Sequence, residues 1–307
     1  MKGRKYNQDT ALHLYQKTEN GFLIFYTISD YLVFFTTVCC QARKRKVRLY
    51  GIAPMQDHFH LMADADKREK VSDFMRDSTS QYALALNASI HSSGRVFHKA
   101  FGSAEKKGDK AIRTCASYLY NNAGEKKLCT RAENYRWTFL AYAKSKHPFS
   151  EPLVHKDLSR AFRRIIKMVD YYSGANIPLE FGWLGKWFSE LASVERQQLI
   201  DYIIVSYNCI DYEKLFSYYD NSYDTACLAF ASNQGSEYDI KEDFVPGSHI
   251  PYLEIPKALK KYHGIYNPKN ALWLPDDQRA NLLCDLAMET HASIRQLKKY
   301  LRLTDGE

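Results

Sequence analysis

The stretch Tyr50-Gly-Ile-Ala-Pro-Met-Gln-Asp-His58-Phe59-His60-Leu-Met-Ala63 predicts two strands joined by a short turn, which form an antiparallel hairpin. Side chains alternate along a strand, so His58 and His60 are expected on one face and Phe59 on the other. Two imidazoles on one face can hold a divalent cation and leave positions open for further ligands. The alternative is a pair of polar, half-exposed histidines on a sheet face, because a short motif alone has a high false-positive rate.

The patterns on either side of this hairpin predict an α+β fold. The predicted strands cover 22–28, 47–53, 58–63 and 95–101, and the predicted helices cover 30–43, 67–90 and 110–121. Residues 102–108 read as a charged loop. The order β-α-β-β-α-β-α is typical of a ferredoxin-like or RRM-like antiparallel sheet with helices on one face, and it places the histidine pair on a central strand.

Length and charge suggest more than one folding unit and an anionic partner. The 307 residues predict about two domains. A net charge of +8 favours nucleic acid but also fits a simple solubility feature. The charge is segregated, since residues 211–244 hold eight acidic residues against two lysines and residues 256–302 are basic again. Segregation of this kind is not needed for solubility.

The cysteines and the N-terminal region predict a cytoplasmic protein without a membrane span. Seven cysteines without a Cys-x-x-Cys motif argue against a disulfide framework and suit the cytoplasm. The N-terminus is polar and predicts no secretory signal. The apolar run 21–40 contains Asp30, whose carboxylate would lie at bilayer depth, so we expect a strand followed by a helix and no membrane span.

A second group of polar residues lies on the helix predicted at 110–121. Tyr118 and Asn122 are four residues apart and therefore share a helical face. A tyrosine hydroxyl, with an ordinary pKa of about 10, needs a nearby cation to attack phosphorus at neutral pH. His58, His60 and the side-chain carbonyl oxygen of Asn122 form one candidate cation site. The alternatives are a packing tyrosine, one of 23 in the chain, and an asparagine that caps the end of its helix.

These residues resemble a known family. The strand motif His58-Phe59-His60, followed by Tyr118-Leu-Tyr-Asn-Asn122 and then by Glu133-Asn-Tyr-Arg-Trp137, looks like the single-tyrosine HUH transposases, in particular the REP-associated tyrosine transposase branch. The resemblance covers about residues 15–145. It implies metal-dependent cleavage and rejoining of single-stranded, often hairpin-associated DNA, with Tyr118 forming a 5′-phosphotyrosine link. It also implies Mg²⁺ or Mn²⁺ as the cofactor, no small-molecule cofactor, and a homodimer.

The chain departs from the family pattern at three places. Gln56-Asp57 stands where Pro-Asn is usual, Ala123 stands where Pro is usual, and Asn122 stands where insertion-sequence relatives carry Gln. The first two affect turn geometry, and the third concerns the reach of the proposed third ligand. Because an imidazole pair is softer than Mg²⁺ prefers, Zn²⁺ also fits the predicted donors.

Basic residues in three segments, together with one glutamine, are candidates for contacts with DNA, with a solvated charged surface as the alternative. They are Arg43, Lys44, Arg45, Lys46, Arg48, Lys106, Lys107, Lys110, Arg113, Arg295, Gln296, Lys298, Lys299 and Arg302. The last five lie on the second of two helices predicted at 276–289 and 293–302. This pair suits a helix-turn-helix whose second helix enters a major groove, or a basic helical hairpin packed on its own domain.

The predicted organisation is a catalytic domain at 1–146, an accessory region at 147–275 that contains the acidic segment, and the DNA-binding element at 276–307. Within the accessory region we expect helices near 158–172, 194–209 and 223–231, with an irregular stretch at 176–187. The leading functional hypothesis is a DNA strand transferase. The alternatives are a non-catalytic DNA-binding regulator of the same fold and a metal-dependent nuclease that uses water.

Overall fold

The computed structural model describes residues 10–154, 156, 158–232 and 248–304. A four-stranded antiparallel sheet has the order β2-β3-β1-β4. The strands are β1 (Thr10–Lys17), β2 (Arg48–Met55), β3 (His58–Asp64) and β4 (Gly102–Lys107). The three helices that belong with this sheet are α1 (Ile28–Arg45), α2 (Arg68–Ser89) and α3 (Gly108–Glu125). The predicted α+β class, with the histidine pair on a central strand, is confirmed.

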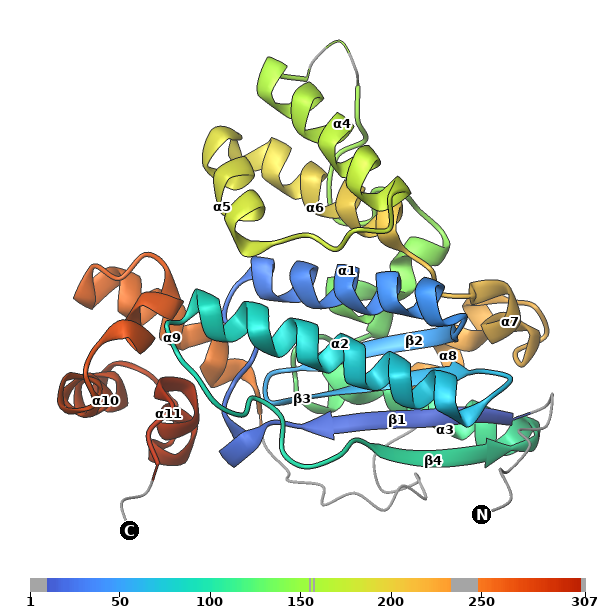
Figure 1. Ribbon diagram of the computed structural model, residues 1–307, viewed down its shortest axis with the longest axis horizontal. Helices are drawn as coiled ribbons and strands as arrows, with labels where there is room; N and C mark the ends of the chain where they lie inside the picture. The colour runs from blue at the N-terminus through green and yellow to red at the C-terminus, as the bar shows by residue number, and fades with distance from the viewer. Residues whose placement is uncertain (1–9, 155, 157, 233–247, 305–307) are drawn as a thin grey trace.

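The two faces of the sheet have separate hydrophobic clusters. Leu12, Phe59 and Leu61 pack with α1 and α2 on one face. Ala11 and Met62 pack with α3 on the opposite face. Figure 1 shows α2 in front of the sheet and α3 behind it. The side chains of β3 that point away from α1 and α2 therefore point toward α3.

The rest of the chain is helical and surrounds this unit. Its helices are α4 (Arg160–Gly174), α5 (Phe181–Glu190), α6 (Ser193–Tyr207), α7 (Tyr212–Ser217), α8 (Tyr223–Ser232), α9 (Ile250–His263), α10 (Asp276–Glu289) and α11 (Ile294–Leu301). Short 3₁₀ helices lie at Glu19–Gly21, Ala132–Asn134, Arg136–Thr138, Leu140–Ala143 and Pro268–Trp273. Much of the acidic segment, 233–247, lies outside the described residues.

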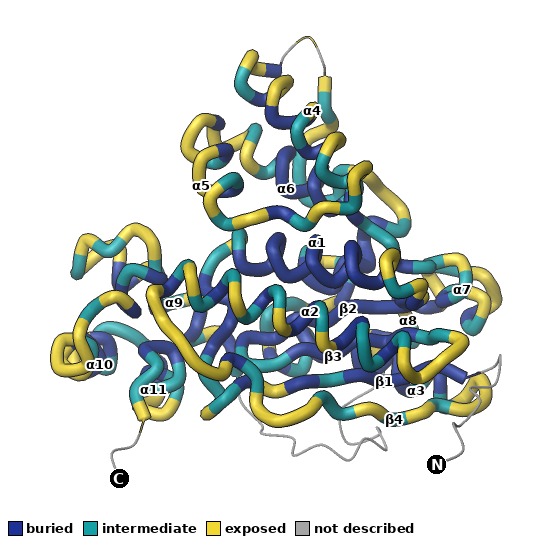
Figure 2. The backbone as a smooth tube through the Cα atoms, viewed as in Figure 1, coloured by how far each residue is buried: buried dark blue, intermediate teal, exposed yellow. Residues whose placement is uncertain are grey.

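Helix α1 is covered on nearly all sides. It lies between the sheet and the α5–α6 layer, and residues 30–42 are buried throughout (Figures 1 and 2). A helix in such a position is apolar all round, which explains the long apolar run in the sequence. None of the helices in the described part of the chain combines the length and the apolar character that a membrane span needs.

One hydrophobic cluster includes side chains from all three predicted domains, from Leu12 to Leu301. Helix α6 packs on α1, and the Tyr26 hydroxyl donates a hydrogen bond to the carbonyl of Tyr300 on α11. The three segments are therefore packed together. The domain boundaries themselves stay a prediction.

Two predicted strands are wrong. Residues 22–27 form no strand, although 23–26 are buried. The amide of Ile24 bonds to the carbonyl of Gln56, and its own carbonyl accepts the Tyr82 hydroxyl. The apolar run in this segment indicates burial, and a buried segment does not have to pair as a strand. The first strand is β1 instead. Its alternating pattern puts Leu12 and Leu14 in the core.

The fourth strand is also displaced. Residues 95–101 contribute only an isolated bridge between Thr18 and Phe97, and the strand is β4, where a charged loop was expected. As an edge strand, β4 exposes every second residue, so its charged residues can face water. The stretch predicted as irregular at 176–187 contains the start of α5.

Candidate functional site

The β2–β3 hairpin carries the two predicted histidines. Met55 pairs with His58, and the connecting turn is Gln56-Asp57. The alternation of β3 buries Phe59 among α1 and α2 and turns His58 and His60 to the α3 face. His60 is 1% exposed, and the two imidazole rings lie 4.9 Å apart and nearly perpendicular. The expected convergence of the two rings is therefore present.

Helix α3 crosses the same face and brings Tyr118 to His60. The Tyr118 hydroxyl lies 3.4 Å from His60 Nε2, and the ring centroids are 5.3 Å apart. Asn122 follows one helical turn later and is buried, and its Oδ1 has no hydrogen-bond partner among the described residues. His60 on the strand and Tyr118 on the helix, 58 positions apart in the sequence, thus place a phenol against an imidazole within one chain.

A third histidine, His13 on β1, was not predicted. Its Nε2 lies 3.0 Å from His60 Nδ1, and the two rings stack with centroids 5.1 Å apart. His13 is fully buried, and within the described part of the chain its Nδ1 has no hydrogen-bond partner. The alternating pattern of residues 10–17 was the signal that could have found it, because it places His13 on the same face as Tyr15 and opposite Leu12.

His58 and His60 are each held through the Nδ1 atom. His58 Nδ1 donates to Asp57 Oδ1 at 2.7 Å, because a carboxylate can only accept. His60 Nδ1 lies 3.0 Å from His13 Nε2, and one of these two nitrogens carries the proton between them. A neutral imidazole that donates through Nδ1 has its lone pair on Nε2. Nε2 of His58 is therefore suited to bind a cation, and so is Nε2 of His60 in the tautomer that donates its Nδ1 proton to His13.

Burial keeps His60 and His13 neutral. Burial, reinforced by the charges of His58, His13, Lys17 and Lys126, holds the pKa of His60 well below its usual value. Burial and the charge of Lys106 lower the pKa of His13 to about 3. Neutral imidazole is the form that binds a metal. Lys17 lies directly across from His58 in the β1–β3 register, so positive charge adjoins the site.

The residues present fit a divalent cation. Among the described residues, no group of three or more His, Cys, Asp or Glu side chains is arranged to hold a metal. The predicted donors are instead two imidazoles and one amide oxygen. The unpartnered Asn122 Oδ1 supports this set, since a buried acceptor without a donor is costly and a bound cation would satisfy it. The amide oxygen suits Mg²⁺ or Mn²⁺, whereas the two imidazoles suit a softer cation such as Zn²⁺.

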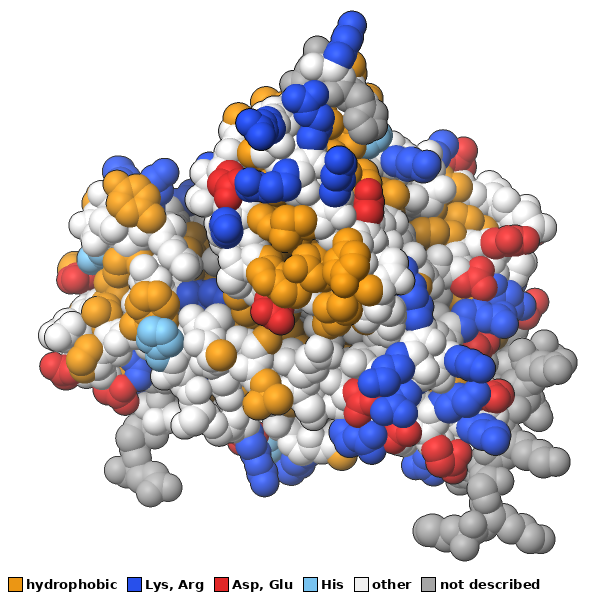
Figure 3. All heavy atoms as spheres, turned by 45° about the horizontal axis from the view of Figure 1, so that its top comes forward, with side chains coloured by type: hydrophobic (Ala, Val, Ile, Leu, Met, Phe, Trp, Pro, Cys, Tyr) orange, Lys and Arg blue, Asp and Glu red, His pale blue; other side chains and the backbone are white. Residues whose placement is uncertain are grey.

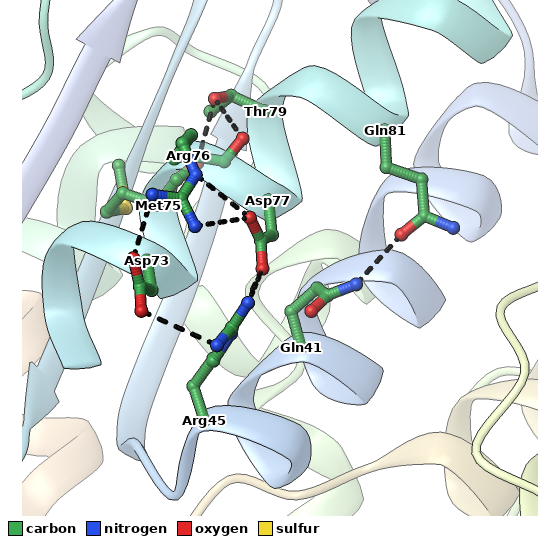
Figure 4. Close-up of polar contacts among 8 residues, drawn as sticks. All are labelled: Gln41, Arg45, Asp73, Met75, Arg76, Asp77, Thr79 and Gln81. Carbon is green, nitrogen blue, oxygen red and sulfur yellow. Dashed lines mark hydrogen bonds and ion pairs between the residues drawn. The ribbon is translucent and has the colours of Figure 1, made fainter.

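The predicted DNA contacts near the end of α1 lie away from this site and are largely occupied. Arg43 donates to the carbonyls of Tyr207 and Asn208. Arg45 forms ion pairs with Asp73 and Asp77 of α2 (Figure 4). Arg48 lies near Asp64 and Asp211, and Lys44 and Lys46 are exposed. The structure does not bring this group to Tyr118.

Four other predicted residues lie on or near the face of the sheet that carries the site. Lys106 pairs with Ala11 in the β1–β4 register. Ala11 and His13 are two residues apart on β1 and face the same side of the sheet, so Lys106 faces that side as well. Lys107 is exposed and lies 3.4 Å from Glu105. Lys110 and Arg113 are exposed on the first turns of α3, the helix that carries Tyr118.

Of the predicted DNA contacts at α11, some contact the protein itself and others face solvent. Gln296 completes the helix N-cap with Ser293, and Arg302 donates to the carbonyl of Leu23. Lys299 forms an ion pair with Asp57, so it faces the protein. Arg295 is exposed and Lys298 partly exposed.

One exposed basic helix was not among the candidates. Figure 3 shows Lys and Arg side chains gathered over the lobe of α4, whereas basic and acidic side chains intermingle near α2 and α7. The exposed basic residues of α4 are Arg160, Arg163, Arg164 and Lys167.

We expect acid to destabilise the fold through its buried histidines. Burial lowers the pKa values of His13 and His249 to about 3, against 6.5 in the unfolded chain. Between pH 6.5 and 3 the unfolded state therefore binds more protons, and the free energy of unfolding falls by about 1.4 kcal/mol per pH unit for each histidine. Urea unfolding in a chelating buffer should show this slope. His249→Gln should reduce the slope by the contribution of one histidine, about 1.4 kcal/mol per pH unit. The control His291→Gln, which changes an exposed histidine, should leave the slope unchanged.

Comparison with known proteins adds little to this geometry. No protein-family model matches the sequence. No curated protein matches it either. The solved structure of a REP-associated tyrosine transposase bound to a REP hairpin is similar to this chain with 14% identity and a TM-score of 0.40, over 51% of this chain and 93% of that one. At this level of similarity the match assigns no function to this chain.

Proposed function

We propose that this protein is a metal-dependent DNA strand transferase that cleaves and rejoins single-stranded, hairpin-associated DNA through a tyrosine–phosphate link. The observation that carries the proposal is the 3.4 Å approach of the Tyr118 hydroxyl to His60 Nε2. It is supported by the capture of both histidines through their Nδ1 atoms. A packing tyrosine would not need a buried, neutral imidazole as its neighbour.

Tyr118 supplies the nucleophile in this proposal. Its oxygen forms a bond to the scissile phosphorus while the bond to the 3′-oxygen breaks, so one phosphodiester replaces another. The phenol loses its proton and the departing 3′-oxygen gains one. Because the link preserves the phosphodiester bond, attack by a new 3′-hydroxyl reverses the step and joins a different strand.

His58, His60 and Asn122 would hold the cation. Mg²⁺ or Mn²⁺ supplies stabilisation of the negative charge on the scissile phosphate when it is bound. Lys17 and Lys126 add fixed positive charge close to His60. Lys126 is itself buried, and burial lowers its pKa.

Tyr118 and His60 meet within one chain, so the proposed site is complete without a partner subunit. The homodimer implied by the family resemblance stays a prediction. A dimer would place a second copy of the site on the DNA, which suits the joining of two strands.

The test is covalent capture. Single-stranded DNA carrying a hairpin and a label on its 3′ segment is incubated with the protein and Mn²⁺, then separated under denaturing conditions. A labelled protein band supports the transferase, because the 5′-phosphate of that segment becomes attached to the protein. Cleavage without a labelled band would indicate a nuclease that uses water, and binding without cleavage would indicate a regulator.

We expect the salt dependence of DNA binding to show which of the predicted basic residues contact phosphate. Lys110→Ala combined with Arg113→Ala should reduce the slope of log K against log salt by about 1.4 for single-stranded DNA, since each lost phosphate contact contributes about 0.7. Arg45→Ala should leave that slope unchanged, because its guanidinium is paired with Asp73 and Asp77. Fluorescence anisotropy at several salt concentrations measures both. An unchanged slope in the double variant would remove these residues from the DNA surface.

A further inference from the structure

The C-terminal helix reaches the metal-binding histidines through a carboxylate. Lys299 on α11 places its Nζ 2.9 Å from Asp57 Oδ2, and Asp57 Oδ1 lies 2.7 Å from His58 Nδ1. The three side chains are 24%, 19% and 19% exposed, so the chain of contacts is mostly shielded from water. Lys299 and Asp57 are 242 residues apart in the sequence.

The two oxygens of Asp57 have different partners, which fixes the rotation of its carboxylate. If the ammonium group of Lys299 were absent, Oδ2 would be free to turn toward solvent and Oδ1 would leave His58. The turn backbone is fixed separately, because the carbonyl of Asp57 accepts from both the amide and the hydroxyl of Thr18. Lys299 therefore acts on the orientation of the side chain rather than on the path of the chain.

The approach of Lys299 is built into the loop before α1. Gly21 has a positive φ of 66°, and a Cβ there would lie 2.9 Å from both Cε and Nζ of Lys299. Lys299 therefore lies directly against Gly21, where the positive φ favours glycine. Two further contacts hold the end of α11 against this loop. Arg302 donates to the carbonyl of Leu23, and Tyr26 donates to the carbonyl of Tyr300.

We propose that Lys299 and Asp57 are positioning residues that hold His58 with its Nδ1 protonated and its Nε2 directed to the cation, so that the C-terminal helical region is required for a competent metal site. This inference rests on the proposed function for the role of the cation. Outer-shell partners of this kind typically change metal affinity by about 10- to 100-fold.

The first test measures metal affinity without DNA. Isothermal titration with Mn²⁺ should show binding weakened about tenfold in Lys299→Met and in Asp57→Asn. Lys299→Arg should restore binding to within about threefold of wild type, because a guanidinium can still pair with the carboxylate. The matched control is Lys257→Met, an exposed lysine on α9 of the same helical region. Circular dichroism checks that each variant is folded.

The second test reads the histidine itself. In the metal-free protein, ¹⁵N spectra of the imidazole nitrogens should show His58 protonated on Nδ1, with an increased Nε2-protonated fraction in Lys299→Met and Asp57→Asn. Lys257→Met should give the wild-type spectrum.

These readouts separate this inference from the proposed function. If the wild type forms no DNA adduct but the variants change the spectrum and the Mn²⁺ affinity as expected, only the transferase assignment fails. If folded Lys299→Met binds Mn²⁺ as the wild type does and leaves the His58 spectrum unchanged, the positioning role is refuted.

Discussion

Tyr118→Phe is expected to abolish the covalent protein–DNA adduct and to reduce strand cleavage by a factor of about 10³ or more. The phenyl ring fills the same space against His60 but carries no oxygen to bond to phosphorus. DNA and Mn²⁺ binding should stay close to wild type, since the hydroxyl is not among the proposed ligands. Adduct formation with labelled hairpin DNA, together with anisotropy for binding, measures these effects.

Two matched variants make this experiment specific. Tyr120→Phe makes the same change on the same helix, but the Tyr120 hydroxyl donates to the carbonyl of Tyr50 in the core, so it should cost only about 1 kcal/mol of stability and keep the adduct. Tyr15→Phe tests the other nearby phenol, whose ring lies 6.3 Å from that of His60. An adduct that survives in Tyr118→Phe and disappears in Tyr15→Phe would move the nucleophile to β1.

Replacing His60 with Ala is expected to weaken Mn²⁺ binding by about 100-fold or more and to remove cleavage with it. Loss of a group that only orients a ligand already costs about 10- to 100-fold, and His60 is proposed as a ligand itself. Titration calorimetry measures the affinity, and cleavage at saturating Mn²⁺ tests whether metal alone restores activity.

The burial of His60 requires a second variant, because the cavity left by His60→Ala lowers the stability of the fold. His58→Ala removes the proposed ligand that is partly exposed, and it should weaken Mn²⁺ binding by a similar factor with a smaller effect on unfolding. His98→Ala, at an exposed histidine that pairs with Glu19, serves as the control. Wild-type Mn²⁺ affinity in both folded site variants would contradict the proposed cation site.

Local sequence patterns determined the parts of the site that depend on one element at a time. The two-residue period of a strand puts His58 and His60 on one face, and the helical period does the same for Tyr118 and Asn122. The same patterns failed at residues 22–27 and at β4. In the first case an apolar run is buried as a loop, and in the second an edge strand exposes its charged residues.

Only the tertiary structure decided which elements meet at that face. The strand order places β1 beside β3, so His13 stacks on His60 across 47 residues of sequence. The packing of α11 against the loop before α1 brings Lys299 to Asp57. Periodicity is a local property that the sequence displays directly, whereas strand order and helix docking depend on how distant apolar surfaces are buried together. The candidate site could therefore be located from the sequence, but the groups that hold its histidines could not.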